Sequence, residues 1–178
     1  MPDLLPDLPD AARVWLYVAD RTLTDHETTA LEAAFARFFE TWHTHRVPVR
    51  GAAAVLGRRV LVVAGARTEG DPADLSGCGI DQHAREVERA GKALGVGWMD
   101  GLAVTFRRPG TDVLEALPRA DFRAGLAAGT ISPGVDVLDA TLPNLGAVRR
   151  GQALRPLVEG PFARWLPADV AAPSPPAP

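Results

Sequence analysis

The chain has 178 residues, a formal net charge of −3 and a single cysteine. The small net charge argues against nucleic acid or an anionic membrane as a partner, and one cysteine excludes an internal disulfide framework. No apolar run approaches the roughly 18 residues that span a bilayer. The first ten residues are rich in proline and aspartate and lack the pattern of a signal peptide. We therefore expect a cytoplasmic protein that binds neither membrane nor nucleic acid.

The two ends of the chain differ in composition from its middle. Residues 1–11 are rich in Pro and Asp and are expected to form an extended lead-in. Residues 168–178 form a Pro-rich tail that has little to bury and is expected to be disordered. Between them we expect one α+β domain over residues 12–167, with a core over 12–108 and a smaller annex over 111–167.

The first expected elements are a strand and a helix. In the run RVWLYVAD, from Arg13 to Asp20, both alternating sets of side chains are mostly apolar or aromatic, which is typical of a central strand covered on both faces. Thr24 and Glu27 have the spacing of a capping box and predict the start of a helix. Apolar residues at helical spacing continue to Trp42 and predict the buried face of that helix.

A hairpin, a second helix and a fourth strand follow. Apolar runs over 52–56 and 60–64 flank Gly57 and predict a β-hairpin, because glycine adopts the backbone conformations of tight turns. A helix is predicted over Ile80–Leu94 and a strand over Leu102–Phe106. The resulting order β-α-β-β-α-β predicts a ferredoxin-like, split-βαβ core.

The annex is expected to be a small α/β unit. A helix over Arg119–Ala128 and a short strand over Val135–Leu138 are predicted there. The region beyond Pro143 is too rich in glycine and proline for a prediction.

The segment Ser76-Gly77-Cys78-Gly79 precedes the second predicted helix. Its glycines allow backbone N–H groups to converge, and a helix N-terminus concentrates partial positive charge. A thiol in that position is expected to have a lowered pKa and to be nucleophilic. The same N–H groups suit a small anion instead. A third interpretation makes Cys78 a small buried residue beside a tight turn.

The split-βαβ topology would bring distant residues to the same edge of the sheet as Cys78. The start of the first strand, the end of the first helix and the end of the fourth strand all meet there, and they carry Arg13, His45 and Arg107. We expect these cations to lower the pKa of Cys78 and to favour anionic ligands. Asp81 is a candidate catalytic carboxylate or, alternatively, a helix cap. The candidate site therefore comprises catalytic Cys78 and Asp81 and the ligand-binding residues Ser76, Gly77, Gly79, His45, Arg13 and Arg107.

Cofactor and metal chemistry receive little support from the sequence. There is no Walker A motif, and the glycines at 95, 97 and 101 precede a strand, whereas a dinucleotide fingerprint follows one. His43, His45, Cys78 and His83 are the available zinc ligands, but Cys78 and His83 lie on different faces of the helix. We predict no metal and no cofactor.

Several motifs together resemble a family of small bacterial proteins. They are R-x-W-x-Y-x-A-D-R from Arg13, T-W-H-T-H from Thr41, S-G-C-G-I-D from Ser76, and the later segment from Phe122 to Pro133. The family carries S-G-C-S-I-D at the third place and is commonly labelled an ABC-transporter ATPase. Because no Walker motif is present, the chain does not support that label. The resemblance implies that Cys78 and Asp81 belong to a site, but it implies no particular reaction.

Two classes of function remain open. The first is a site for a small molecule or anion around Cys78, with or without thiol-dependent chemistry. The second is a non-enzymatic interaction module, acting as an adaptor or a homodimer, in which Cys78 is structural. Thiol reactivity separates them, because an interaction module has no need of an activated cysteine.

Overall fold

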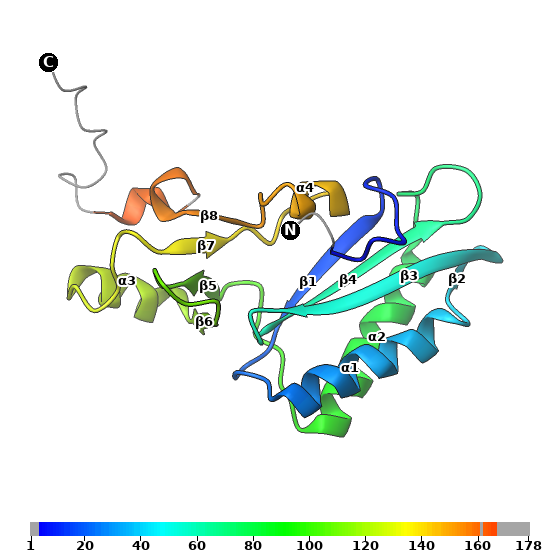
Figure 1. Ribbon diagram of the computed structural model, residues 1–178, viewed down its shortest axis with the longest axis horizontal. Coiled ribbons are helices and arrows are strands. Elements are labelled where there is room, and N and C mark those ends of the chain that lie inside the picture. The colour runs from blue at the N-terminus through cyan, green and yellow to red at the C-terminus, as the bar shows by residue number, and fades with distance from the viewer. Residues whose placement is uncertain (1–3, 161, 167–178) are drawn as a thin grey trace, which may run out of the picture.

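The computed structural model describes residues 4–160 and 162–166, which form two lobes side by side (Figure 1). One lobe contains a four-stranded sheet with the long helices α1 and α2. The other contains a second four-stranded sheet with the helix α3. The fold is therefore a mixed α+β arrangement, as expected.

The first sheet consists of β1 (Arg13–Val18), β2 (His43–Thr44), β3 (Val47–Leu56) and β4 (Val60–Arg67). Its order is β1-β4-β3-β2, with every neighbouring pair antiparallel. The predicted hairpin is confirmed and is longer than expected. Gly57 and Arg58 both have positive φ in its turn, 52° and 55°, the conformation that tight β-hairpin turns require.

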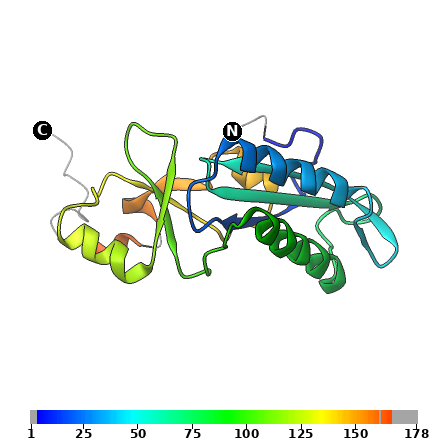
Figure 2. The same cartoon turned by 90° about the horizontal axis from the view of Figure 1, so that it is seen from below.

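Helices α1 (Asp25–Phe39) and α2 (Gly77–Leu94) pack side by side on one face of this sheet (Figure 2). The predicted capping box is confirmed, because Thr24 and Glu27 exchange hydrogen bonds at the start of α1. On this face, Leu61 and Val63 of β4 lie against the fully buried Phe35 of α1. The side chains of β1 that face the helices are the aromatic residues Trp15 and Tyr17.

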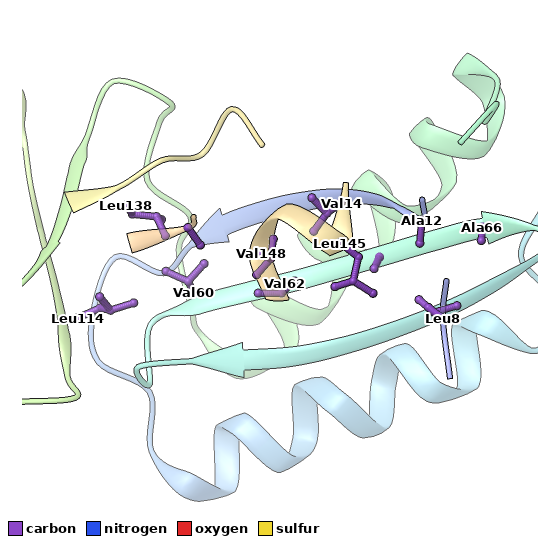
Figure 3. Packing of buried hydrophobic residues seen from close by; sticks show 12 residues of the cluster. Leu8, Ala12, Val14, Val60, Val62, Ala66, Leu114, Leu138, Leu145 and Val148 are labelled. Atoms are coloured by element: carbon purple, nitrogen blue, oxygen red, sulfur yellow. The ribbon is translucent and has the colours of Figure 1, made fainter. Parts of the chain in front are cut away.

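The opposite face of the sheet is covered by α4 (Leu145–Arg149) and by residues that precede β1 (Figure 3). Val14 of β1 and Val62 of β4 lie against Leu145 and Val148 of α4. Both faces of β1 and β4 are thus covered, with β4 buried and β1 largely half-buried, which accounts for strands whose two alternating sets are both apolar.

The second sheet contains β5 (Val104–Arg107), β6 (Leu114–Leu117), β7 (Asp136–Leu138) and β8 (Leu154–Pro156), in the order β6-β5-β7-β8. The helix α3 (Arg119–Ala127) packs Phe122 and Leu126 into the core of this lobe. Two 3₁₀ turns, Leu157–Glu159 and Ala163–Trp165, complete it.

The predicted fourth strand of the first sheet is wrong in its placement. After α2, only an isolated bridge between Ala19 and Trp98 continues along β1. The chain then turns away at Asp100, where the N–H of Ala103 bonds its carbonyl, and β5 joins the second sheet. The ferredoxin-like topology is therefore not confirmed, although β1, β3 and β4 have the order that it requires.

The lead-in is also different from the expectation. Residues 4–11 form turns rather than an extended segment, and Leu8 is buried in the core. The Arg149 guanidinium holds these turns, donating to the carbonyl oxygens of Leu4, Leu5 and Leu8. The predicted tail over 168–178 lies outside the described residues. Within the described ranges, no helix is both long and apolar enough to cross a membrane.

Candidate functional site

The candidate site lies where the short hairpin of β2 and β3 meets the first turn of α2. Trp42, just before β2, is buried and donates from Nε1 to the carbonyl of Gly79 at 2.8 Å. The Gln82 amide donates to the carbonyl of His43 at 3.1 Å. These two bonds fix the hairpin against the helix.

The turn of this hairpin has an uncommon backbone. His45 and Arg46 have φ of 46° and 67°, a region that residues other than glycine seldom occupy. Such conformations persist where the surrounding structure over-determines them. Here the turn brings the backbone N–H of His45 to the sulfur of Cys78.

Ser76 is the N-cap of α2, but its hydroxyl does not cap the helix backbone. It lies 3.0 Å from Cys78 Sγ and 2.5 Å from Thr44 Oγ1. Thr44 Oγ1 accepts the N–H of Ser76 at 3.0 Å. The Thr44 proton can then point to Ser76 Oγ, and the Ser76 proton to the sulfur. The relay runs Thr44 to Ser76 to Cys78 and favours a thiolate at its end.

The sulfur of Cys78 occupies the place that a capping oxygen normally takes. The Ser76 hydroxyl lowers the pKa of the thiol most, followed by the N–H of His45. Desolvation opposes them, and the N–H groups of Gly79 and of Cys78 itself add smaller lowering effects. A thiolate accepts these hydrogen bonds far better than a neutral thiol does. The side chain is also exposed, so a small reagent can reach it.

The two flanking glycines have different roles. A Cβ on Gly79 would lie 3.1 Å from Cβ and 3.2 Å from Oγ1 of Thr44, closer than ordinary contacts. Gly79 therefore allows the close approach of helix and hairpin that builds the hydroxyl relay. A Cβ on Gly77 would meet nothing within 4 Å, so space does not require glycine there.

Not all of the predicted site residues come together. His45 reaches Cys78 through its backbone, while its side chain is exposed. Arg13 stacks its guanidinium over Trp15, 5.3 Å from the ring centroid. Asp81 is exposed, with no hydrogen bond or ion pair in the part of the chain that the structure describes, so it neither caps α2 nor contacts Cys78.

Arg107 does not belong to this site. It lies on β5 in the other lobe (Figure 1) and donates to Asp136 at 2.6 Å. Arg107 was expected near Cys78 because its strand was predicted to be the fourth strand of the first sheet. That strand is β5, which belongs to the second sheet. Arg13, His45 and Arg107 were predicted to place positive charge near Cys78. None of their charged side chains makes a described contact with Cys78.

His83 is not available as a ligand or as a base for Cys78. It is fully buried between aromatic rings, with its centroid 4.2 Å from that of Trp15, and its Nε2 lies 2.9 Å from the Tyr17 hydroxyl. Burial lowers its pKa to about 4. Over residues 4–160 and 162–166, no three His, Cys, Asp or Glu side chains gather into a metal site.

Thr44 is the one residue of the candidate site that the sequence did not suggest. It lies between two histidines that drew attention as metal ligands, yet it is buried while both neighbours are exposed. The alternation of a strand would have pointed Thr44 inward, opposite to His43 and His45. Only the contact with Ser76 reveals its role.

Comparison with known proteins gives no further assignment. No family model matches the chain, and no curated protein or solved structure is significantly similar to it. The resemblance to the family with an S-G-C-S-I-D motif therefore stays a prediction.

Proposed function

We propose that this protein carries a thiol-dependent small-molecule site, in which the Cys78 thiolate attacks a small electrophile. The observation that carries the proposal is the 3.0 Å contact between the Ser76 hydroxyl and the exposed sulfur of Cys78. The nearby N–H groups of His45, Gly79 and Cys78 lower the pKa of the thiol in the same direction. These donors stabilise negative charge at that atom. Because these donors already interact with the sulfur, they are not free to bind a separate anion. The arrangement therefore favours a nucleophilic Cys78 over an anion-binding pocket.

Disulfide exchange is the reaction that fits this site with fewest additional groups. The thiolate attacks a small disulfide, a bond forms between Cys78 Sγ and one sulfur, and the other sulfur leaves as a thiolate that takes its proton from water. The lowered pKa of Cys78 increases the fraction of thiolate, which is the reactive form, so the attack uses no separate general base. This agrees with a site in which His83 bonds Tyr17, Arg107 lies in the other lobe, and Asp81 has no described hydrogen bond to the sulfur.

The composition limits how the adduct can be removed. The chain contains one cysteine, so no second thiol of the same chain can displace the bound group. We expect the mixed disulfide to persist until a second small thiol attacks it. The site would thus hold one covalent adduct per chain and release it by exchange.

The rate of alkylation by iodoacetamide, followed by mass spectrometry over about pH 5 to 10, tests the proposal. With a single thiol, each modification event reports on Cys78. We expect the midpoint to lie below that of N-acetylcysteine measured in parallel. Ser76→Ala should raise the midpoint, because it removes the hydroxyl donor. Thr44→Val should raise it less, because Thr44 acts through Ser76.

A matched control is available in the other lobe. Ser132→Ala removes a hydroxyl whose one bond within the described part of the chain is to the local N–H of Gly134, and it should leave the midpoint unchanged. A small symmetrical disulfide such as oxidised 2-mercaptoethanol should form one adduct with the native protein. A midpoint at or above that of N-acetylcysteine would show that the sulfur is an ordinary thiol and would refute the proposal.

A further inference from the structure

One side of β1 has backbone hydrogen-bonding groups that the fold leaves without partners. β1 lies at the edge of the first sheet and pairs with β4 on one side only. Odd-numbered positions point their backbone groups toward β4, as the bond from Ala19 N–H to the carbonyl of Arg59 shows. In an antiparallel strand the even-numbered positions then point the other way, toward the place of the missing fourth strand.

The chain itself occupies only the two ends of this edge. At one end, Met99 N–H bonds the carbonyl of Val18 at 2.8 Å. At the other end, Leu145 N–H bonds the carbonyl of Ala12, also at 2.8 Å. Between these points, the N–H and C=O of Leu16 and the N–H of Val18 have no hydrogen-bond partner among the described residues.

A cavity of about 300 Å³ lies beside this free section of the edge. The lobes form its walls, with Leu16 and Val18 of β1 on one side and Ala103, Thr105 and Leu138 on the other. Thr105 is 3% exposed, and its hydroxyl is buried with no partner in the described ranges. A buried hydroxyl without a partner is costly, and a rotation of the Thr105 side chain toward the cavity that it lines would let a ligand satisfy this hydroxyl.

The charge at the mouth of the cavity indicates which kind of ligand fits. Asp100 is the one carboxylate among its lining residues, and no cationic side chain lines it. Asp100 is exposed, and its Oδ1 accepts the N–H of Leu102 at 2.9 Å, which fixes the carboxylate where the chain leaves β1. The cavity therefore combines strand-like backbone groups, apolar walls and a negative end.

We propose that this cavity binds the N-terminal residues of an extended peptide. The peptide pairs antiparallel with β1, continuing the direction of residues 97–99, and exchanges backbone hydrogen bonds with Leu16. Its terminal ammonium group lies at Asp100, next to the last bond of the chain to Val18. The Thr105 hydroxyl, once its side chain has turned toward the cavity, bonds the peptide from the opposite wall. This site is independent of the Cys78 thiolate.

Trialanine amide with a free N-terminus is the probe, and its N-acetylated form is the control. Titration of the ¹⁵N-labelled protein should shift the amide signals of Leu16 and Val18 in a saturable way, and their hydrogen exchange should slow. Acetylation should weaken binding about three- to fivefold, as expected for an exposed ion pair. Asp100→Asn, which keeps an acceptor for Leu102, should weaken binding of the free peptide equally and leave that of the acetylated peptide unchanged.

Thr105→Val tests the opposite wall without loss of a hydrogen bond in the free protein. It should weaken binding about three- to tenfold, whereas Thr28→Val on α1 should leave it unchanged. If Leu16 and Val18 do not respond to about 10 mM peptide, where even a millimolar Kd is saturated, the site is refuted. Equal binding of free and acetylated peptides would overturn the assignment to an N-terminus.

Discussion

The buried imidazole of His83 makes the stability of this protein depend on pH. The side chain has no exposed surface and lies among Trp15, Tyr17 and Trp42. Desolvation is the main cause that lowers its pKa, from 6.5 to about 4, and the nearby positive charge of Arg13 contributes in the same direction. His83 is therefore neutral in the folded protein at pH values where the unfolded chain is protonated.

The sign and size of the effect follow from proton linkage. Below pH 6.5 the unfolded chain binds a proton at this position, and the folded protein does so only below about pH 4. The free energy of unfolding therefore falls as the pH is lowered from 6.5 to 4. A difference of roughly 2.5 pKa units at 1.36 kcal/mol each corresponds to about 3 kcal/mol.

Urea unfolding at several pH values between about 4 and 7 measures this loss. His83→Gln removes the titrating ring but keeps a polar group for Tyr17, and it should flatten the pH dependence by about 3 kcal/mol. His26→Gln, at an exposed position of α1, is the control and should behave as the native protein does. Equal pH slopes for the native protein and His83→Gln, or an NMR titration of His83 near 6.5, would refute the reasoning.

Two further predictions concern the contact between sheet and site. A Cβ on Gly65 would lie 2.3 Å from the Trp42 ring, so Gly65→Ala should lower the free energy of unfolding by about 1–3 kcal/mol, while Gly77→Ala, with open space around it, should not. Trp42→Phe removes the indole N–H that bonds the carbonyl of Gly79 and shrinks a buried ring, and it should cost about 1–3 kcal/mol. Urea unfolding measures both, and native stability in either Gly65→Ala or Trp42→Phe would contradict the packing described.

Local sequence patterns predicted most elements of the first lobe. The capping box of Thr24 and Glu27, the two apolar sets of β1 and the glycine turn of the hairpin are local signals, and each was confirmed. The interest in Cys78 was also a local inference, from glycines at the start of a helix. The position of its sulfur among donors needed the β2–β3 turn, whose sequence gave no hairpin signal.

The sequence failed where the result depended on which sheet a strand joins. A strand near Phe106 was predicted correctly, but its apolar residues suit either sheet, so its pattern could not reveal that it pairs with β6 and β7. That one difference removed Arg107 from the site and left the edge of β1 open.

Local sequence signals predicted the helices α1, α2 and α3, the main hairpin and a lone cysteine at a helix N-terminus, because these features depend on neighbours within a few residues. Two features became visible in the tertiary structure alone: Thr44 and Ser76 form a relay to the sulfur, and β5 joins the second sheet, which leaves one edge of β1 open. Both depend on contacts between residues far apart in the chain, and many pairings of similar strands satisfy the same local pattern.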